Sequence, residues 1–217
     1  MNSFNWFNYN NNVKLLKKLS NLNKKNKFNF IEKGIYNHVR DIFCLSLFIT
    51  QSRVKRTKIK VLDYGSNSLA YVNLVNKINT KSFNFNIYDP FYKNNKRIKK
   101  KDLNFFSNQK KLKNNWDMIN FGSSLQYLKN LKLLNKINFK RSKVVLITHT
   151  PISIGKSYIS KQINNKGLFQ NIHSISNIKN LMKKNNLKLI FKSRNEDKYV
   201  SAIQKQKTYS LNLLFVK

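Results

Sequence analysis

Acidic residues and glycines are scarce in this chain, and several of them stand directly after short apolar runs. The 217 residues include 8 acids, 5 glycines and 2 prolines. Asp63 and Gly65 end one apolar run, and Asp89, followed by Pro90, ends the next. A glycine at a strand end lets the backbone turn tightly beside a ligand, and an acid about 20 residues further on accepts hydrogen bonds from ribose hydroxyls. The spacing therefore predicts a site for a nucleotide-type cofactor.

Polar residues also follow the fourth and fifth apolar runs. The fourth ends in Asn-Phe-Gly-Ser-Ser at residues 120–124, and the fifth ends at His149. Histidine titrates near neutral pH, which suits a general base, and a histidine hydrogen-bonded to a neighbouring loop is the alternative interpretation. His38 is expected on a helix before the sheet and His173 in a late helix. Three histidines so widely separated predict no metal site.

From residue 58 onward, short apolar runs alternate with longer segments, and this alternation predicts parallel strands joined by helical crossovers. The segment between the last two runs has little helical period, which favours an antiparallel pair there. We therefore expect an α/β fold with a Rossmann-like, seven-strand doubly wound sheet, mostly parallel with the last strand antiparallel. Strands are predicted near residues 58–63, 84–88, 103–106, 117–121, 143–148, 187–193 and 209–216.

The N-terminal part of the chain is an extension to this sheet. Between Glu32 and Gln51 the apolar positions recur at mixed spacings of three and four, which is typical of an amphipathic helix. Residues 1–30 are rich in Asn, Lys and aromatic residues without a clear period. We expect residues 1–55 to form an arm and a helix that covers the sheet, and residues 56–217 to form the cofactor-binding domain.

Asp117 is a further acid, but it stands at the start of the fourth predicted strand. In a doubly wound sheet the ligand lies at the carboxyl ends of the strands. Four residues at ~3.3 Å each place Asp117 ~13 Å from that edge. We therefore predict a structural role for Asp117.

The charge of the chain is extreme, at +35 from 43 Lys and Arg residues against 8 acids. Only 6 of the 43 are Arg, and 36 residues are Asn. Nucleic-acid-binding proteins depend on Arg for bidentate contacts, so nucleic acid is not the favoured partner. Codons rich in A and T explain the Lys and Asn content without selection for binding. The charge still attracts anionic substrates, nucleic acid and acidic lipid headgroups over ~8 Å.

Other features predict a cytoplasmic location. Cys44 is the single cysteine, which excludes an internal disulfide framework and a cysteine-rich zinc site. The first residues are polar and lack the apolar core of a signal peptide. The apolar run around Cys44 is shorter than the ~20 residues that span a bilayer, so no transmembrane segment is expected.

The motifs together resemble class I S-adenosylmethionine-dependent methyltransferases. They are Val-Leu-Asp-Tyr-Gly-Ser at residues 61–66, the acid Asp89, Trp-Asp-Met-Ile-Asn at 116–120, and Val-Leu-Ile at 145–147 with Thr-Pro at 150–151. Leu-Gln-Tyr-Leu at 125–128 and the Thr-Pro pair resemble, more narrowly, a bacterial family of methyltransferases associated with surface-polysaccharide gene clusters. The resemblance covers roughly residues 31–217.

This resemblance implies S-adenosyl-L-methionine as the cofactor. Gly65, Ser66 and Asn67 would lie against its methionine moiety. Asp63 would position that loop or meet the amino group, and Asp89 would accept from the ribose hydroxyls. The family has a second glycine near Asn67, so a non-catalytic binding module on a degraded methyltransferase fold stays open as an alternative. Asn tolerates positive φ better than most residues, which favours a preserved turn.

The resemblance also assigns the rest of the site. The adenine would meet Phe91 and Ser107, and the floor under the sulfonium would be Phe121, Gly122 and Ser123. The acceptor would meet Gln126, Tyr127 and Lys156, although packing of Tyr127 and solvation of Lys156 are equally good interpretations. With His149 as base, the predicted reaction is methylation of a glycan or sugar-linked small molecule, and the lysines are compatible with an anionic acceptor. An RNA methyltransferase is the other enzymatic alternative.

Overall fold

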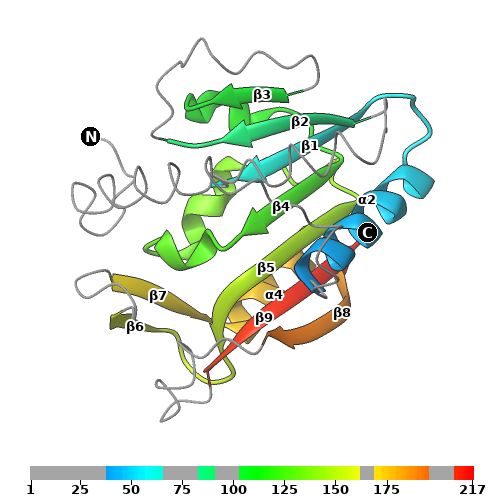
Figure 1. The fold of residues 1–217 in the computed structure, drawn as a ribbon. Helices are drawn as coiled ribbons and strands as arrows, with labels where there is room; N and C mark the ends of the chain where they lie inside the picture. The colour runs from blue at the N-terminus through cyan, green and yellow to red at the C-terminus, as the bar shows by residue number, and fades with distance from the viewer. Residues whose placement is uncertain (1–37, 66–82, 91–102, 162–168, 196–207) are drawn as a thin grey trace, which may run out of the picture.

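The computed structural model describes residues 38–65, 83–90, 103–161, 169–195 and 208–217 (Figure 1). Nine strands and several helices occupy these ranges. In chain order they are α2 His38–Arg53, β1 Ile59–Tyr64, β2 Phe83–Tyr88, β3 Leu103–Phe106, the 3₁₀ turn η1 Gln109–Lys113, β4 Met118–Gly122, the 3₁₀ turns η2 Leu125–Tyr127 and η3 Leu131–Lys136, β5 Val144–Ser153, β6 Tyr158–Lys161, β7 Phe169–Ser174, α4 Ile175–Lys184, β8 Lys188–Asn195 and β9 Thr208–Val216.

The main sheet has the predicted Rossmann-like topology. Strands β3, β2, β1, β4 and β5 lie side by side in that order and run parallel. β9 then pairs antiparallel with β5, and β8 pairs antiparallel with β9. These seven strands confirm the seven predicted ranges and the antiparallel last strand. The strand order reverses between β1 and β4, which is where doubly wound sheets bind ligands.

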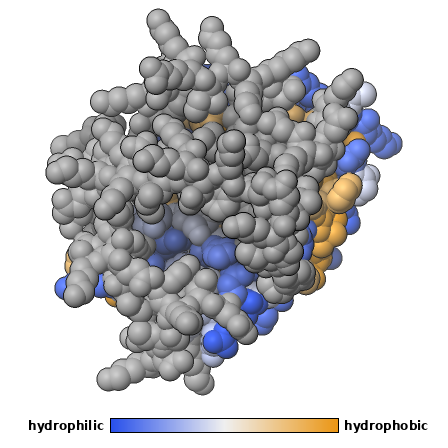
Figure 2. Space-filling model, viewed as in Figure 1, coloured by the Kyte–Doolittle hydropathy of each residue, from blue (hydrophilic) through white to orange (hydrophobic). Residues whose placement is uncertain are grey.

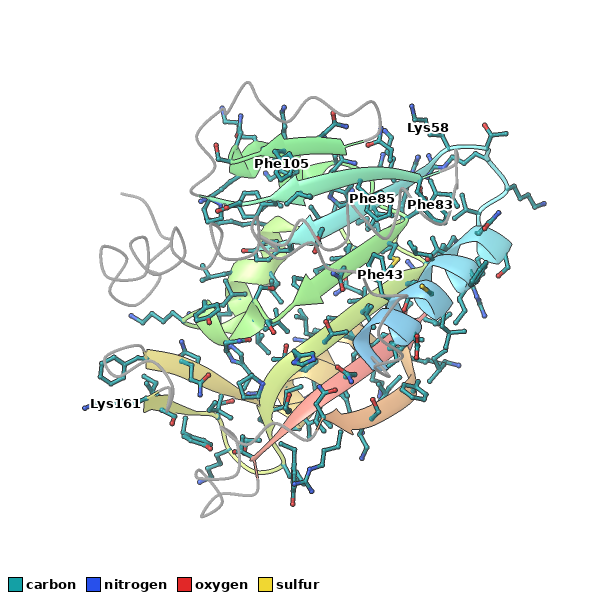
Figure 3. The ribbon with its side chains drawn as sticks, in the orientation of Figure 1. Phe43, Lys58, Phe83, Phe85, Phe105 and Lys161 are labelled. Atoms are coloured by element: carbon teal, nitrogen blue, oxygen red, sulfur yellow. The ribbon has the colours of Figure 1, made fainter. Side chains whose placement is uncertain are left out.

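Period-two burial places a separate apolar core on each face of the sheet. Val61 and Met118 point to one face, where they pack with Phe43 of α2 and with Phe83 and Phe85 of β2. Figure 3 shows these three phenylalanines where α2 crosses the sheet. Alternate residues of the same strands pack on the opposite face with the 3₁₀ turns and α4. Helices thus cover both faces, as the alternation of strands and longer segments predicts.

α2 confirms the predicted helix within the described residues, and residues 32–37 lie outside them. The helix buries Ser46 and Thr50 at no hydrogen-bond cost, because each hydroxyl donates to the carbonyl four residues earlier at 2.7 Å. On its outer side Leu45 and Phe48 are exposed. Figure 2 shows hydrophobic surface at the right, in the region where Figure 1 places α2. Among the described helices, none is long and apolar enough to span a membrane.

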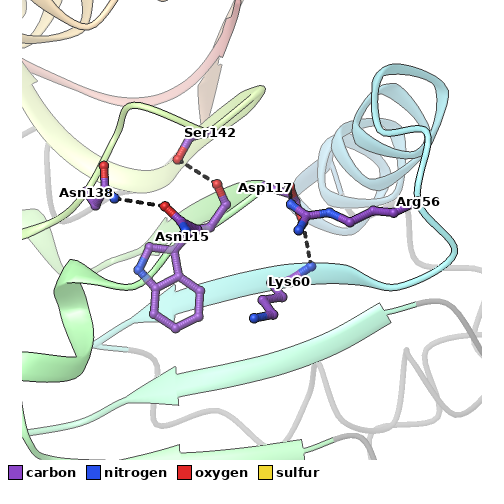
Figure 4. A network of polar contacts seen from close by, with 7 residues as sticks. Arg56, Lys60, Asn115, Asp117, Asn138 and Ser142 are labelled. Atoms are coloured by element: carbon purple, nitrogen blue, oxygen red, sulfur yellow. Dashed lines mark hydrogen bonds and ion pairs between the residues drawn. The ribbon is translucent and has the colours of Figure 1, made fainter.

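Asp117 has the predicted structural role at the amino-terminal edge of the sheet (Figure 4). Its side chain is buried, accepts from the Lys60 backbone N–H at 2.8 Å and pairs with the Arg56 guanidinium. Its backbone bonds to Lys60 of β1 and, just before β5, to Lys143. One carboxylate therefore joins the starts of β1 and β4 to the loop before β1.

Three details differ from the sequence-based expectations. The segments between β3 and β4 and between β4 and β5 contain short 3₁₀ turns where α-helical crossovers were expected. A hairpin of β6 and β7, which the sequence did not predict, extends the sheet beside the end of β5. The expected helical position of His173 is wrong, because it lies on β7 and α4 begins only after the N-cap Ser174.

Candidate functional site

The ends of β1, β2 and β4 form one edge, to which their arrowheads point at the left of Figure 1. Gly65 turns the chain there with a φ of 71°, a conformation that favours glycine. Its N–H donates to the Tyr88 carbonyl at 2.8 Å, and the Asp89 N–H donates to the Phe106 carbonyl at 3.0 Å. These bonds hold Gly65 and Asp89 at neighbouring strand ends, which is the arrangement that the spacing predicts.

A buried polar pair lies just inside this edge, on the face that α2 covers. Asp63 is 2% exposed and Asn120 fully buried, and Asn120 Nδ2 donates to Asp63 Oδ1 at 2.9 Å. The Asn120 Oδ1 atom has no hydrogen-bond partner among the described residues. From the sequence, Asn120 is predicted to lie at the strand end and has no assigned role. A fully buried polar residue inside the apolar β4 is the signal that identifies it.

Aromatic side chains form the opposite side of the same strand ends. The Tyr64 ring centroid lies 5.0 Å from that of Tyr88 and 5.3 Å from that of Phe121. Burial raises the pKa of both tyrosines, and the Asp89 charge adds to the effect on the pKa of Tyr88. Both hydroxyls therefore stay neutral. Phe121 is fully buried in this cluster, so contact with a cofactor would fall to its backbone.

His149 does not end its strand as predicted, because β5 continues to Ser153; it lies in a strained bulge level with the end of β4. Two residues of β5, Thr148 and His149, stand opposite the single residue Asn212 of β9, and His149 has a φ of 48°. Ser123, after β4, has a φ of 50°, donates its N–H to the Thr148 carbonyl at 2.9 Å and its hydroxyl to the His149 carbonyl at 3.0 Å. Such strain clusters at functional sites, where surrounding bonds hold it.

Asn212 holds the bulge from the other side. It is fully buried on β9, and its Oδ1 accepts from the His149 backbone N–H at 3.1 Å. Reciprocal bonds to Asn195 on β8, at 2.7 and 3.0 Å, and a bond to Ser193 orient its amide. The backbone of His149 is thus fixed by β9 on one side and by the β4 end on the other. Sequence reasoning missed Asn212, whose only local signal is an amide inside an apolar strand.

The predicted acceptor-binding residues divide into a buried and an exposed group. Gln126 is 6% exposed and Tyr127 half-buried on η2, whereas Lys156 is exposed in the turn between β5 and β6. Ser107 is exposed after β3, and Gly122 is half-buried at the end of β4. The predicted cofactor residues Ser66, Asn67 and Phe91 lie outside the described residues.

His173 of β7 faces η2. Its Nε2 lies 3.0 Å from the Leu125 carbonyl, to which it donates. Burial lowers the pKa of His173, against the opposing effect of its bonds to the Leu125 and Leu128 carbonyls. The residue therefore belongs to the interior as a neutral donor, and the described residues contain no group of His, Cys, Asp or Glu that could hold a metal ion.

Acidification should weaken the fold through His173. Because its pKa is lower in the folded state, the unfolded chain binds the proton first as the pH falls below about 6.5, and stability then decreases by up to about 1.4 kcal/mol per pH unit. In His173→Gln, which keeps a neutral donor, the free energy of unfolding should vary less between pH 7 and 5. Urea unfolding at each pH measures this, and parallel curves for the two proteins would contradict it.

Comparison with solved structures identifies the fold. The chain is similar to the Burkholderia thailandensis 1,6-didemethyltoxoflavin-N1-methyltransferase, solved with 1,6-didemethyltoxoflavin and S-adenosylhomocysteine, with a TM-score of 0.54 at 10% identity over 95% of this chain and 88% of that one. It is also similar to magnesium protoporphyrin IX methyltransferase from Synechocystis PCC 6803, with a TM-score of 0.51 at 10% identity over 95% and 99%. It is similar as well to an O-methyltransferase of a Brevibacillus brevis polyketide synthase, with a TM-score of 0.53 at 15% identity over 81% of this chain and 71% of that one.

Both of the latter structures contain S-adenosylhomocysteine. No family model and no curated protein sequence matches this chain. The chain therefore has the Rossmann-like fold of S-adenosylmethionine-dependent methyltransferases at low sequence identity.

Proposed function

We propose that this protein is a methyltransferase that uses S-adenosyl-L-methionine. The observation that carries the proposal is the placement of Gly65, in a left-handed turn at the end of β1, beside Asp89 at the end of β2, in a sheet with the methyltransferase strand order. The turn leaves backbone free to approach a ligand, and the acid stands where ribose hydroxyls are bound in such folds. The unpartnered Asn120 Oδ1 near the same edge is a further polar group available to a ligand.

The residues at this edge would each contact a different part of the cofactor. Gly65, with Ser66 and Asn67, would hold the methionine moiety, and Asp63, oriented by Asn120, would support that loop or meet the amino group. Asp89 would bind the ribose, while Phe91 and Ser107 would meet the adenine. Gly122, Ser123 and the Phe121 backbone would form the floor. When bound, S-adenosylmethionine supplies an activated methyl group.

His149 is the proposed general base. A hydroxyl acceptor must lose its proton as it attacks, and an imidazole held at the strand end can take that proton. Its backbone is fixed by Asn212 and Ser123, so little reorientation is needed before the proton moves. Ordered placement of the acceptor is the other requirement of methyl transfer, and η2 lies next to this base.

For the acceptor we propose a glycan or a sugar-linked small molecule, methylated in the cytoplasm during polysaccharide synthesis. The Leu-Gln-Tyr-Leu segment on η2 and the Thr-Pro pair in β5 support this assignment through their resemblance to methyltransferases of surface-polysaccharide gene clusters. Two structurally similar enzymes are named for small-molecule substrates, 1,6-didemethyltoxoflavin and magnesium protoporphyrin IX.

Calorimetry with S-adenosylmethionine and S-adenosylhomocysteine tests the proposed function. The wild-type protein should bind both, and Asp89→Ala should raise the dissociation constant at least tenfold, because it removes the acceptor for the ribose hydroxyls. Asp41→Ala is the matched control, since it removes an equal charge from α2. It should leave the dissociation constant within twofold.

Two results would contradict the proposal. Failure of the wild type to bind either ligand at millimolar concentration would exclude a working cofactor site and favour a non-catalytic module. An unchanged dissociation constant in Asp89→Ala would show that the end of β2 does not contact the cofactor.

A further inference from the structure

Three buried polar atoms without hydrogen-bond partners lie on two facing elements, η2 and β7. They are Ser124 Oγ, Gln126 Oε1 and Asn171 Nδ2, and none of them has a partner among the described residues. All three residues are at most 6% exposed. Buried polar groups in native proteins are nearly always bonded, so unpartnered ones require an explanation.

The packing of β7 on η2 brings together the two segments that carry these atoms. His173 of β7 bonds to the Leu125 carbonyl of η2, which shows that the His173 side chain points to η2. Side chains two residues apart on a strand share a face, so Asn171 points the same way. Ser124 is the N-cap of η2, but its hydroxyl makes no capping bond. Asn171 thus faces the turn that carries Ser124 and Gln126.

This polar cluster adjoins the proposed base. Ser123, which precedes Ser124, donates its hydroxyl to the His149 carbonyl. β7 pairs with the end of β5, where His173 stands opposite Ile152. Figure 2 shows hydrophilic surface in a hollow on this face, in the region where Figure 1 places the ends of β4, β5 and β7. A group bound between η2 and β7 would therefore lie beside His149.

The chemistry of the three atoms defines what they would bind. The Asn171 amide offers a donor, Gln126 Oε1 an acceptor, and the Ser124 hydroxyl either. No charged side chain is among them, and the nearby Lys156 is exposed in the turn after β5. A buried carbonyl oxygen repels an anion, whereas an uncharged group with both a donor and an acceptor satisfies the whole set.

We propose that η2 and β7 form the acceptor site, and that it takes an uncharged hydroxyl- or amide-bearing group, such as the hydroxyls of a neutral sugar. This inference rests on the proposed methyltransferase function and deepens it. Gln126 and Asn171 would recognise the acceptor, and the β6–β7 hairpin would form one wall of the site. The exposed Lys156 would not bind an anionic acceptor.

The first test needs no ligand. Asn171→Leu replaces an amide whose buried Nδ2 has no partner among the described residues with an apolar group of similar shape, so the Tm of the free protein should rise by about 2–6 °C. The same change at Asn212, whose amide is fully bonded, should lower the Tm by at least as much. A fall in the Tm of Asn171→Leu would show that its amide has a structural partner and would overturn the inference.

The second test identifies the acceptor class. Transfer of labelled methyl from S-adenosylmethionine is measured with galactose and N-acetylglucosamine, and with glucuronic acid and N-acetylglucosamine 1-phosphate. The uncharged sugars should accept label, and Gln126→Leu and Asn171→Leu should reduce transfer at least tenfold through KM. Lys192→Ala, which removes an exposed lysine from β8, is the control and should change it less than twofold.

Each other outcome has a defined meaning. Label in the two anionic sugars, lost in Lys156→Ala, would overturn the inference, as would normal cofactor binding with no label in any of the four. Absence of cofactor binding in the wild type would instead overturn the proposed function itself.

Discussion

His149→Ala should reduce methyl transfer at least 100-fold while leaving the dissociation constant of S-adenosylmethionine unchanged. General-base catalysis contributes ~10²–10⁴-fold to such reactions, and an alanine can take no proton. The residues proposed for the methionine moiety and the ribose lie at the ends of β1 and β2, and the bond from Ser123 goes to the His149 backbone carbonyl, which alanine keeps, so the substitution should spare cofactor binding. The rate is measured with the sugar that the wild type methylates, and the affinity by calorimetry.

His149→Gly separates the base from the bulge. With a φ of 48° at residue 149, glycine relieves the strain that alanine keeps, so the glycine variant should be about 1 kcal/mol more stable than the alanine variant. Both should be equally inactive if only the imidazole matters. Normal turnover in His149→Ala would leave the residue with a packing role alone.

Asp117→Ala should destabilise the protein by about 3 kcal/mol, the largest stability effect that we expect. Truncation of one partner of a buried ion pair costs about 3–5 kcal/mol, and the lower value applies because the Arg56 side chain is 43% exposed. The substitution also leaves the Lys60 backbone N–H without its acceptor. Urea unfolding measures the loss, and cofactor affinity should be unchanged because Asp117 lies at the other edge of the sheet.

Two variants show which part of the contact matters. Asp117→Asn keeps an oxygen for the Lys60 N–H and should lose about 1 kcal/mol. Arg56→Met should lose about 2 kcal/mol, because it leaves the buried Asp117 carboxylate without its counter-ion while the bond from the Lys60 N–H remains. If the free energy of unfolding fell no more in Asp117→Ala than in Arg56→Met, the Asp117 carboxylate would not stabilise this edge of the sheet.

Much of the fold follows from local pattern. Buried runs such as Val61-Leu62 and Val144 to Thr148 are short, apolar and bounded by polar residues, and a strand is the only element of that length that buries both faces. The hairpin of β6 and β7 was not predicted for two reasons. The side chains of β6 alternate only between half-buried and exposed, which gives a weak strand pattern. The His-Ser pair at the end of β7 fits the start of a helix equally well.

The sequence by itself determined where β1, β2 and β4 end, and therefore that Asp63, Gly65, Asp89 and Gly122 belong to the carboxyl ends of parallel strands, whereas β5 continues past His149 to Ser153. The alternating burial along a strand and the turn residues that end it are local properties of the sequence, so they can be predicted without knowledge of the fold. The tertiary structure alone decided that Asn212 holds the His149 backbone, that Asn120 orients Asp63, and that His173 bonds to the Leu125 carbonyl. These partners are brought together by strand pairing and packing between distant segments, and a lone amide within an apolar strand does not specify which distant group it will bond.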